Sequence, residues 1–207
     1  MKNCKLPFLV LSLLLTSFSA FALVEVRGHF GAGNGSPDDY NKAYHSFQDG
    51  PKLDQQKYLG WDAIVKAPLF PIGVGLRYET LGEERSEFAE KAELDASRFS
   101  LVLNYRFIDT LIYAGVLGTY GLSHDLTLNI PTDPNKITSE SAKSYSLGIE
   151  GGVKLGFFRL GAEVGQMFMT FDDLEDSTGV RPSNNSVSIK EIDLSGTYYK
   201  IMVGVGF

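Results

Sequence analysis

Hydrophobic and polar positions alternate with a period of two along most of the chain, and the last segment, 196–207, shows this most plainly. Its apolar face carries Tyr199, Ile201, Val203, Val205 and Phe207. This period is that of a β-strand, whose successive side chains point to opposite faces. A soluble domain seldom ends in this way, because chain ends fray and lie in water. In a closed transmembrane barrel, by contrast, the last strand pairs with the first and its apolar face contacts lipid.

The same alternation predicts eight strands. They are expected at about 23–32, 58–69, 72–81, 97–107, 111–123, 144–157, 159–171 and 196–207. The fifth has the least regular alternation, and its end is placed either at 123 or as far on as 129. The seventh loses its pattern at 166–169, where we expect a β-bulge.

The connections between these strands alternate between long and short. Long, polar segments at about 34–57, 82–96, 130–143 and 172–193 are expected to be loops, whereas the connections at 70–71, 108–110 and 157–158 are tight turns. The composition of 82–96 is compatible with a short surface helix. An even number of strands places both termini at one end, which in known membrane barrels is the periplasmic end with the short turns.

Outward-facing aromatic residues fall into two groups, one near each end of the strands. Phe30, Trp61, Tyr78, Phe99, Tyr120, Tyr145 and Phe168 lie toward the loops, and Phe107, Phe157 and Phe207 toward the turns. Such girdles mark the two membrane interfaces. The fold class expected is therefore all-β, an eight-stranded antiparallel up-and-down transmembrane β-barrel. A soluble sandwich or lipocalin-like barrel is disfavoured because it needs no aromatic rings.

Residues 1–22 have the pattern of a secretory signal peptide. Lys2 and Lys5 precede an apolar run at 6–15, and an A-x-A site ends at Ala22, which predicts cleavage before Leu23 and a barrel domain at 23–207. The single cysteine, Cys4, lies in the segment expected to be removed, so the mature chain would have no thiol.

Charge and hydropathy limit the functions and membrane topologies that the chain could have. The formal charge is −6, and losing two lysines would leave 17 basic against 25 acidic residues, or −8. This acidic balance disfavours a nucleic-acid partner. No other stretch is long and apolar enough for a membrane helix, so only a closed barrel could span a bilayer, because lipid offers no partner for open backbone groups.

By strand number, alternation and terminal strand, the chain resembles the small eight-stranded outer-membrane β-barrel family that includes the OmpA transmembrane domain, OmpX and Ail. The resemblance implies location in the bacterial outer membrane, contact with lipid and lipopolysaccharide, and recognition by the barrel-assembly machinery. The assembly signal would be Tyr199, Ile201, Val203, Val205 and Phe207. Unlike in OmpA, we do not expect a C-terminal peptidoglycan-binding domain. A shared fold does not carry function with it.

Inward positions collect charges of both signs, which we expect to form an ion-pair network in the lumen. They are Glu25, Arg27, Asp62, Lys66, Arg77, Glu79, Arg106, Glu150, Lys154, Arg159, Glu163 and Lys200. An eight-stranded lumen is narrow enough to be filled by side chains, and inward glycines at 73, 75, 148, 152, 156, 161, 165 and 204 leave room for long arms. Arg106, Lys154 and Arg159 are the expected partners of Glu150. The alternative is a narrow ion path.

The histidines do not indicate an enzyme. Lipid A deacylases of similar architecture carry His and Ser two residues apart, whereas Gly31, Phe47 and Leu126 follow His29, His45 and His124 at that spacing. We expect His29 in the inner polar network and the others in loop or interfacial positions, with no catalytic residue and no cofactor.

The loops carry most of the negative charge, and 82–96 and 172–193 each sum to −4. They could remain solvated, or bind divalent cations or a basic partner, but 172–176 lacks the spacing of a calcium loop, so no metal site is assigned. The sequence thus favours a non-enzymatic outer-membrane barrel with a structural or surface-interaction role. A small pore and a lipid A-modifying enzyme are the alternatives.

Overall fold

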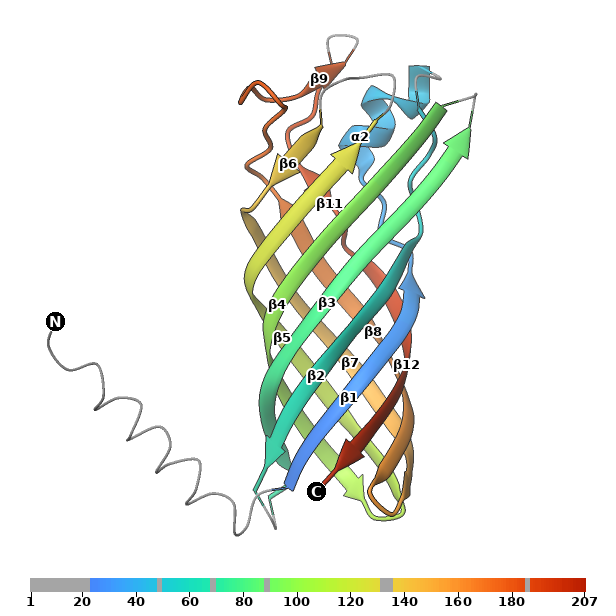
Figure 1. The fold of residues 1–207 in the computed structure, drawn as a ribbon, viewed down its shortest axis with the longest axis vertical. Coiled ribbons are helices and arrows are strands. Elements are labelled where there is room, and N and C mark those ends of the chain that lie inside the picture. The colour runs from blue at the N-terminus through green and yellow to red at the C-terminus, as the bar shows by residue number, and fades with distance from the viewer. Residues whose placement is uncertain (1–22, 48–49, 68–69, 88–89, 131–135, 185–186) are drawn as a thin grey trace, which may run out of the picture.

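The computed structural model describes residues 23–47, 50–67, 70–87, 90–130, 136–184 and 187–207, so the expected signal peptide lies outside the described residues. The strands of the barrel wall are β1 (Leu23–Gly33), β2 (Gln56–Lys66), β3 (Ile72–Glu87), β4 (Glu90–Asp109), β5 (Ile112–Asn129), β7 (Ala142–Leu155), β8 (Phe158–Phe171) and β12 (Gly196–Gly206). Figure 1 shows them as tilted strands around a closed cylinder.

All neighbouring strands of the wall are antiparallel, and the sheet closes on itself. Its ten strands include the short β6 (Ile137–Ser139) and β11 (Ile192–Asp193), which lie outside the wall, so eight strands form the barrel. The first and last strands pair from Glu25↔Gly206 to Gly33↔Tyr198. The expected fold, including pairing of the terminal strand with the first, is confirmed. We call the end where β1 begins and β12 ends the turn end, and the opposite end the loop end (Figure 1).

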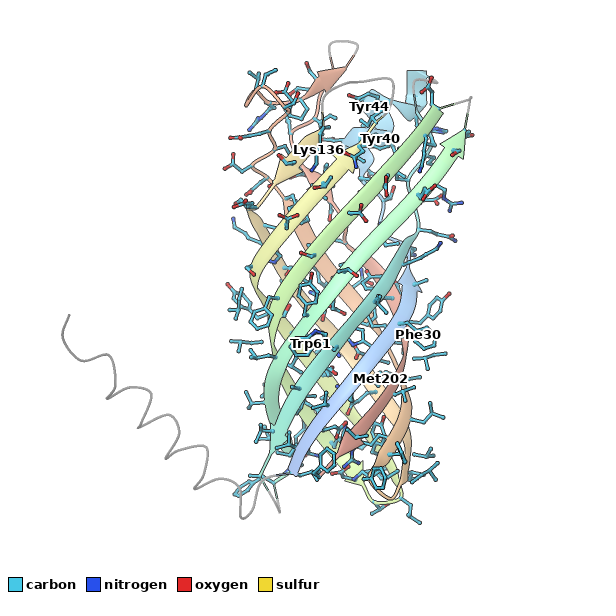
Figure 2. All side chains as sticks on the ribbon, viewed as in Figure 1. Phe30, Tyr40, Tyr44, Trp61, Lys136 and Met202 are labelled. Atoms are coloured by element: carbon cyan, nitrogen blue, oxygen red, sulfur yellow. The ribbon has the colours of Figure 1, made fainter. Side chains whose placement is uncertain are left out.

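The outward face carries an apolar band between two groups of aromatic residues. In the loop-end group, Trp61, Tyr78 and Phe99 are direct cross-strand neighbours, as are Tyr120, Tyr145 and Phe168. Phe107, Phe157 and Phe207 are exposed at the turn end. The spans 99–107 on β4 and 158–168 on β8 match the roughly 9–11 residues that cross a bilayer. Figure 2 shows Phe30 pointing away from the wall of the barrel.

The strands continue well beyond the loop-end aromatic group, and this corrects the expected loop at 82–96. β3 and β4 form one hairpin paired as far as Glu87↔Glu90, with no helix in its described residues. Leu94 and Ala96 point inward and are buried, whereas Asp95 is exposed. The period of two therefore persists here. Only the chemistry of the two faces exchanges: the outward face becomes polar, and the inward face becomes apolar and forms a core.

The same exchange accounts for the irregular pattern of β8, whereas a bulge accounts for that of β5. β8 pairs with β7 through 166–169 with no register shift, so the expected bulge there is wrong. Its inward residues change from charged to apolar at Met167, which blurs the pattern without altering the geometry. The bulges lie in the β4/β5 pairing, at Leu122 of β5 and Phe107 of β4. Beyond Leu122 the parity of β5 reverses, so that Leu126 points inward although Tyr120 points outward.

The loop segments fold over the mouth of the barrel, and are not simply solvated connections. They form α2 (Asp38–Ala43), the 3₁₀ turn His45–Phe47, β6, β9 (Ser183–Asn184), β10 (Val187–Ser188) and β11. With the inward side chains of the wall they enclose one apolar core that includes Tyr40, Tyr44, Leu53, Leu94, Met169, Phe171, Ile189 and Leu194. Figure 2 shows Tyr40 and Tyr44 at the loop end. Among the described residues, no helix is long and apolar enough to span a membrane.

Candidate functional site

The charged lumen lies below this apolar core, and the structure places the sequence-predicted site residues as follows. Glu25, Arg27, Asp62, Lys66, Arg77, Glu79, Arg106, Glu150, Arg159, Glu163 and Lys200 are each at most 5% exposed. Lys154 is half-buried and lies at the turn end. Charged groups withdrawn from water must be paired, because an isolated buried charge costs several kcal/mol.

The lower half of the network is centred on Glu25 and Glu150. Arg106 donates two hydrogen bonds to Glu25, both of 2.8 Å, and a third from Nε to Glu150 at 2.5 Å. Arg27 reaches Glu150 from the other side at 2.5 Å. Of the partners expected for Glu150, only Arg106 contacts it, since Arg159 pairs with Glu25 at 3.1 Å and Lys154 lies elsewhere.

The upper half joins the lower half through Asp62. Arg27 donates to Asp62 from Nη2 at 2.8 Å, and Arg77 donates to the same carboxylate at 2.7 Å. Arg77 also forms two hydrogen bonds with Glu163, of 2.9 and 2.8 Å. Bidentate arginine–carboxylate pairs are among the strongest polar contacts in proteins, so these strands are tied together across the lumen.

Glu79 is the acidic centre at the top of the network. Arg98 donates to it from Nε at 2.6 Å, Lys200 is bonded to it, and His29 Nε2 lies 3.2 Å away. The ammonium of Lys200 also lies over the rings of Tyr58 and Tyr198, 4.8 and 4.2 Å from their centroids. Aromatic faces stabilise such a cation where water is excluded.

At the turn end, Asp109 collects the remaining cations. Lys66 and Lys154 lie 2.7 and 2.5 Å from its carboxylate. Although partial burial acts to raise it, the hydrogen bonds from Lys154 and Lys66 hold the pKa of Asp109 below its ordinary value. These two ion pairs lie at the turn end of the barrel.

Several members of the network escaped the sequence analysis. Arg98 follows the inward alternation of its strand but was left out of the predicted set. Asn104, which donates to Glu150 at 2.8 Å, and Tyr198, which donates to Glu163 at 2.7 Å, are neutral inward residues that a search for charges overlooks. Asp109 lies next to a turn, where an acid normally signals only solvation. His29, by contrast, was expected in the inner polar network and lies beside Glu79.

Glycines provide space for the long arms at particular points. A Cβ on Gly204 would lie 2.8 Å from Cγ of Arg27, and one on Gly73 would lie 2.8 Å from Cγ of Lys66. Gly156, expected to point inward, instead lies exposed in the turn between β7 and β8 with φ of 65°, a conformation that favours glycine.

The other titratable groups do not assemble a recognisable reaction centre. His124 Nε2 and Ser144 Oγ are 2.7 Å apart, but Ser144 is only 3% exposed. The pair links β5 and β7 where their backbone pairing ends at Tyr120↔Tyr145. Within the described ranges, no group of three or more His, Cys, Asp or Glu side chains could hold a metal ion.

Comparisons with solved structures recover this architecture. Neisserial surface protein A aligns with a TM-score of 0.50 at 8% identity over 89% of this chain and 97% of its own. OprG from Pseudomonas aeruginosa gives 0.51 at 14% over 90% and 96%. Ail of Yersinia pestis, solved with the heparin analogue sucrose octasulfate, gives 0.50 at 12% over 90% and 99%. The chain has the fold of the small outer-membrane β-barrels. No protein-family model and no curated protein matches the sequence.

Proposed function

We propose that this protein is a non-catalytic, non-conducting barrel of the bacterial outer membrane, which presents a folded acidic surface outside the cell. The observation that carries the proposal is the exchange of chemistry along the strands. The exposed apolar residues of the wall lie mainly between the two aromatic groups. At that height the interior holds the charged network beside a small cluster of Ile64, Val102 and Leu117, and above it the interior is apolar. This is the arrangement expected of a barrel that spans lipid and continues into water.

The filled lumen supports a role other than conduction. Two successive plugs close it, the ion-pair network and the apolar core under α2, and an eight-stranded barrel is only wide enough for its own side chains. Purified protein in a planar bilayer should therefore show no steady single-channel current. A reproducible, ion-selective conductance would contradict the proposal. Lipid A of unchanged mass after expression would support the absence of a modifying activity.

The surface charge suggests the chemistry of an external partner. The hairpin segment 82–96 and the segment 172–193 each carry six acidic against two basic residues. The Ail structure contains a polyanion, and this surface would repel such a ligand. We expect immobilised heparin to retain the protein no better than a neutral resin at low salt, whereas a polycationic surface should retain it in a salt-dependent way. Retention on heparin would contradict this.

The orientation and processing belong to the same proposal. We place the turn end in the periplasm, the loop end outside the cell and the mature N-terminus at Leu23. Protease added to intact cells should cut this protein only within the loop-end segments. The mass of the protein purified from the membrane fraction should correspond to residues 23–207. Retention of residues 1–22 would contradict the processing.

The final strand provides a test of assembly. Tyr199, Ile201 and Val203 are outward and exposed, and the backbone of Phe207 is hydrogen-bonded to Val24 at 3.0 and 2.9 Å. We propose that this face is the signal read by the barrel-assembly machinery. Deleting Phe207 should reduce the heat-modifiable barrel in the outer membrane more than it reduces synthesis, whereas Phe207→Tyr should assemble nearly as well as the wild type. Equal assembly of the wild type, the Phe207 deletion and Phe207→Tyr would contradict a role of Phe207 in the assembly signal.

A further inference from the structure

His124 and Ser144 bridge an interval in the barrel wall at the loop end. The backbone pairing of β5 with β7 ends at Tyr120, and its pairing with β6 begins at Leu126. Between these two ladders, the described residues 121–125 of β5 have no paired strand on that side. The hydrogen bond between His124 Nε2 and Ser144 Oγ, 2.7 Å long, is the one side-chain hydrogen bond that the described residues form across this interval. It takes the place of backbone pairing there.

The imidazole is packed against the loop-end core. Phe171 of β8 meets its ring edge-on, with the ring centroids 6.2 Å apart, and Phe171 and Leu126 both belong to that core. A Cβ on Gly121 would overlap both Ser144 Oγ and His124 Nε2, so the glycine leaves the room in which the two side chains meet. The hydrogen bond and the core packing therefore depend on each other.

The charged group that acts on His124 is a cation, Arg98. The two residues are cross-strand neighbours on β5 and β4, and Arg98 is fully buried, with Glu79 as its carboxylate partner at 2.6 Å. β7 presents the hydroxyl of Ser144 to the imidazole and β8 presents the phenylalanine ring, while the carboxylate of Asp125, next in sequence, is exposed. Burial first, and then the charge of Arg98, hold the pKa of His124 below its ordinary value of about 6.5. The ring is therefore neutral at pH 7.

Protonation of the imidazole would change this arrangement in two ways. It places a second positive charge beside Arg98, and a buried charge without a partner is costly. It also makes both ring nitrogens donors, so the ring can no longer accept a hydrogen bond from Ser144. His124 is only partly buried and lies at the interval in the wall, so the charged ring gains water by leaving the core. Its departure breaks the link between β5 and β7 and leaves a space beside Phe171.

We propose that the hydrogen bond between His124 and Ser144 is an acid-sensitive latch, which holds the loop-end core closed while the imidazole is neutral and releases it on protonation. The direction of the pH dependence follows from linkage. Because the pKa of His124 is lowered in the folded state, the closed loop end binds a proton less readily than the opened one. The contribution of the latch to stability is complete above about pH 6.5 and is lost as the pH falls from there toward the lowered pKa.

Amide hydrogen exchange of the protein in detergent micelles, corrected for the intrinsic pH dependence of exchange, tests the latch. Between pH 7.5 and pH 5.5, we expect the amides of β6 and of β5 beyond Tyr120 to lose protection. The loss should be at most about tenfold for each pH unit below 6.5, the limit for one proton. The amides between the two aromatic groups should stay protected. Unchanged protection at the loop end, or an equal loss along the whole length of the strands, would overturn the proposal.

Three variants assign the effect to this histidine. His124→Gln keeps an amide that can bond to Ser144 but does not titrate, so it should remove the pH dependence, while His45→Gln, at the other loop-end histidine, should retain it. Gly121→Ala should displace the pair and give at pH 7.5 the low protection that the wild type shows at pH 5.5. A pH dependence unchanged in His124→Gln, or lost equally in His45→Gln, would overturn the latch. If His124→Gln does not fold, an NMR titration of His124 in the wild type decides, because a pKa at or above 6.5 rejects the proposal and a lower one supports it.

Discussion

Glu150→Ala should lower the free energy of unfolding by about 3–5 kcal/mol, since it takes one carboxylate partner from each of two buried arginines. Glu150 is 4% exposed and binds Arg106 and Arg27, both at 2.5 Å, and Asn104 at 2.8 Å. Its removal would leave Arg27 with Asp62 and Arg106 with Glu25, so the network would lose its central contact but not every partner. Denaturant unfolding in detergent, followed by fluorescence and by gel mobility, measures the change.

A surface carboxylate provides the matched control for this variant. Glu191 is exposed on the last loop segment, so Glu191→Ala should stay within about 0.5 kcal/mol of the wild type. The comparison also separates a plug from a pore. A Glu150→Ala barrel that is as stable as the wild type but conducts ions with altered selectivity would reject the structural interpretation of the network.

The alternation along the strands was readable because it is local. A period of two assigns each side chain to a face without knowledge of the neighbouring strand, so the charged inward set and the aromatic groups follow from the sequence alone. The identity of the ion-pair partners across the lumen does not follow from the sequence. Arg27 and Glu150 are 123 residues apart in sequence, and their contact depends on closure of the whole cylinder. Lys154 was expected to pair with Glu150 but pairs with Asp109. Which carboxylate a lysine reaches depends on how far along the barrel axis each side chain lies, and the alternation does not give that position.

The structure of the loop end could not be predicted from the sequence for a different reason. Beyond the loop-end aromatic group the apolar side chains of the wall point inward, so the rule that apolar residues point outward is inverted there. Leu94 and Ala96 keep the parity of their strand, yet the acidic composition of their segment predicts a loop. The apolar residues Tyr40, Tyr44 and Leu53 of segment 34–57 were the available signal that this segment packs on something. The Gly, Pro and Asp content of this segment instead predicted a solvated loop.

The second large loss of stability is expected from substitution of Phe171 in the apolar core at the loop end. This side chain is fully buried among the core residues, next to the ring of His124 at 6.2 Å between centroids. Phe171→Ala should cost about 3–5 kcal/mol, the usual cost of removing a buried phenylalanine. Because the core lies above the ion-pair network, we expect the loss to fall mainly on the loop end. The α2 segment should become sensitive to protease while the membrane-spanning part remains folded and heat-modifiable.

Phe168 provides the comparison, since it lies on the same strand but faces outward and is 40% exposed. It stacks on Tyr145 with ring centroids 4.7 Å apart, so Phe168→Ala should cost no more than about 1.5 kcal/mol for the lost pair beyond its smaller change in buried area. It should leave the protease resistance of the loop end unchanged. If Phe171→Ala instead unfolded the whole barrel in one transition with no protease-sensitive intermediate, the loop-end core and the charged lumen would form one cooperative unit. The ion-pair network and the loop-end core would then not be separable layers, and the loop-end surface would depend on the rest of the barrel for its folding.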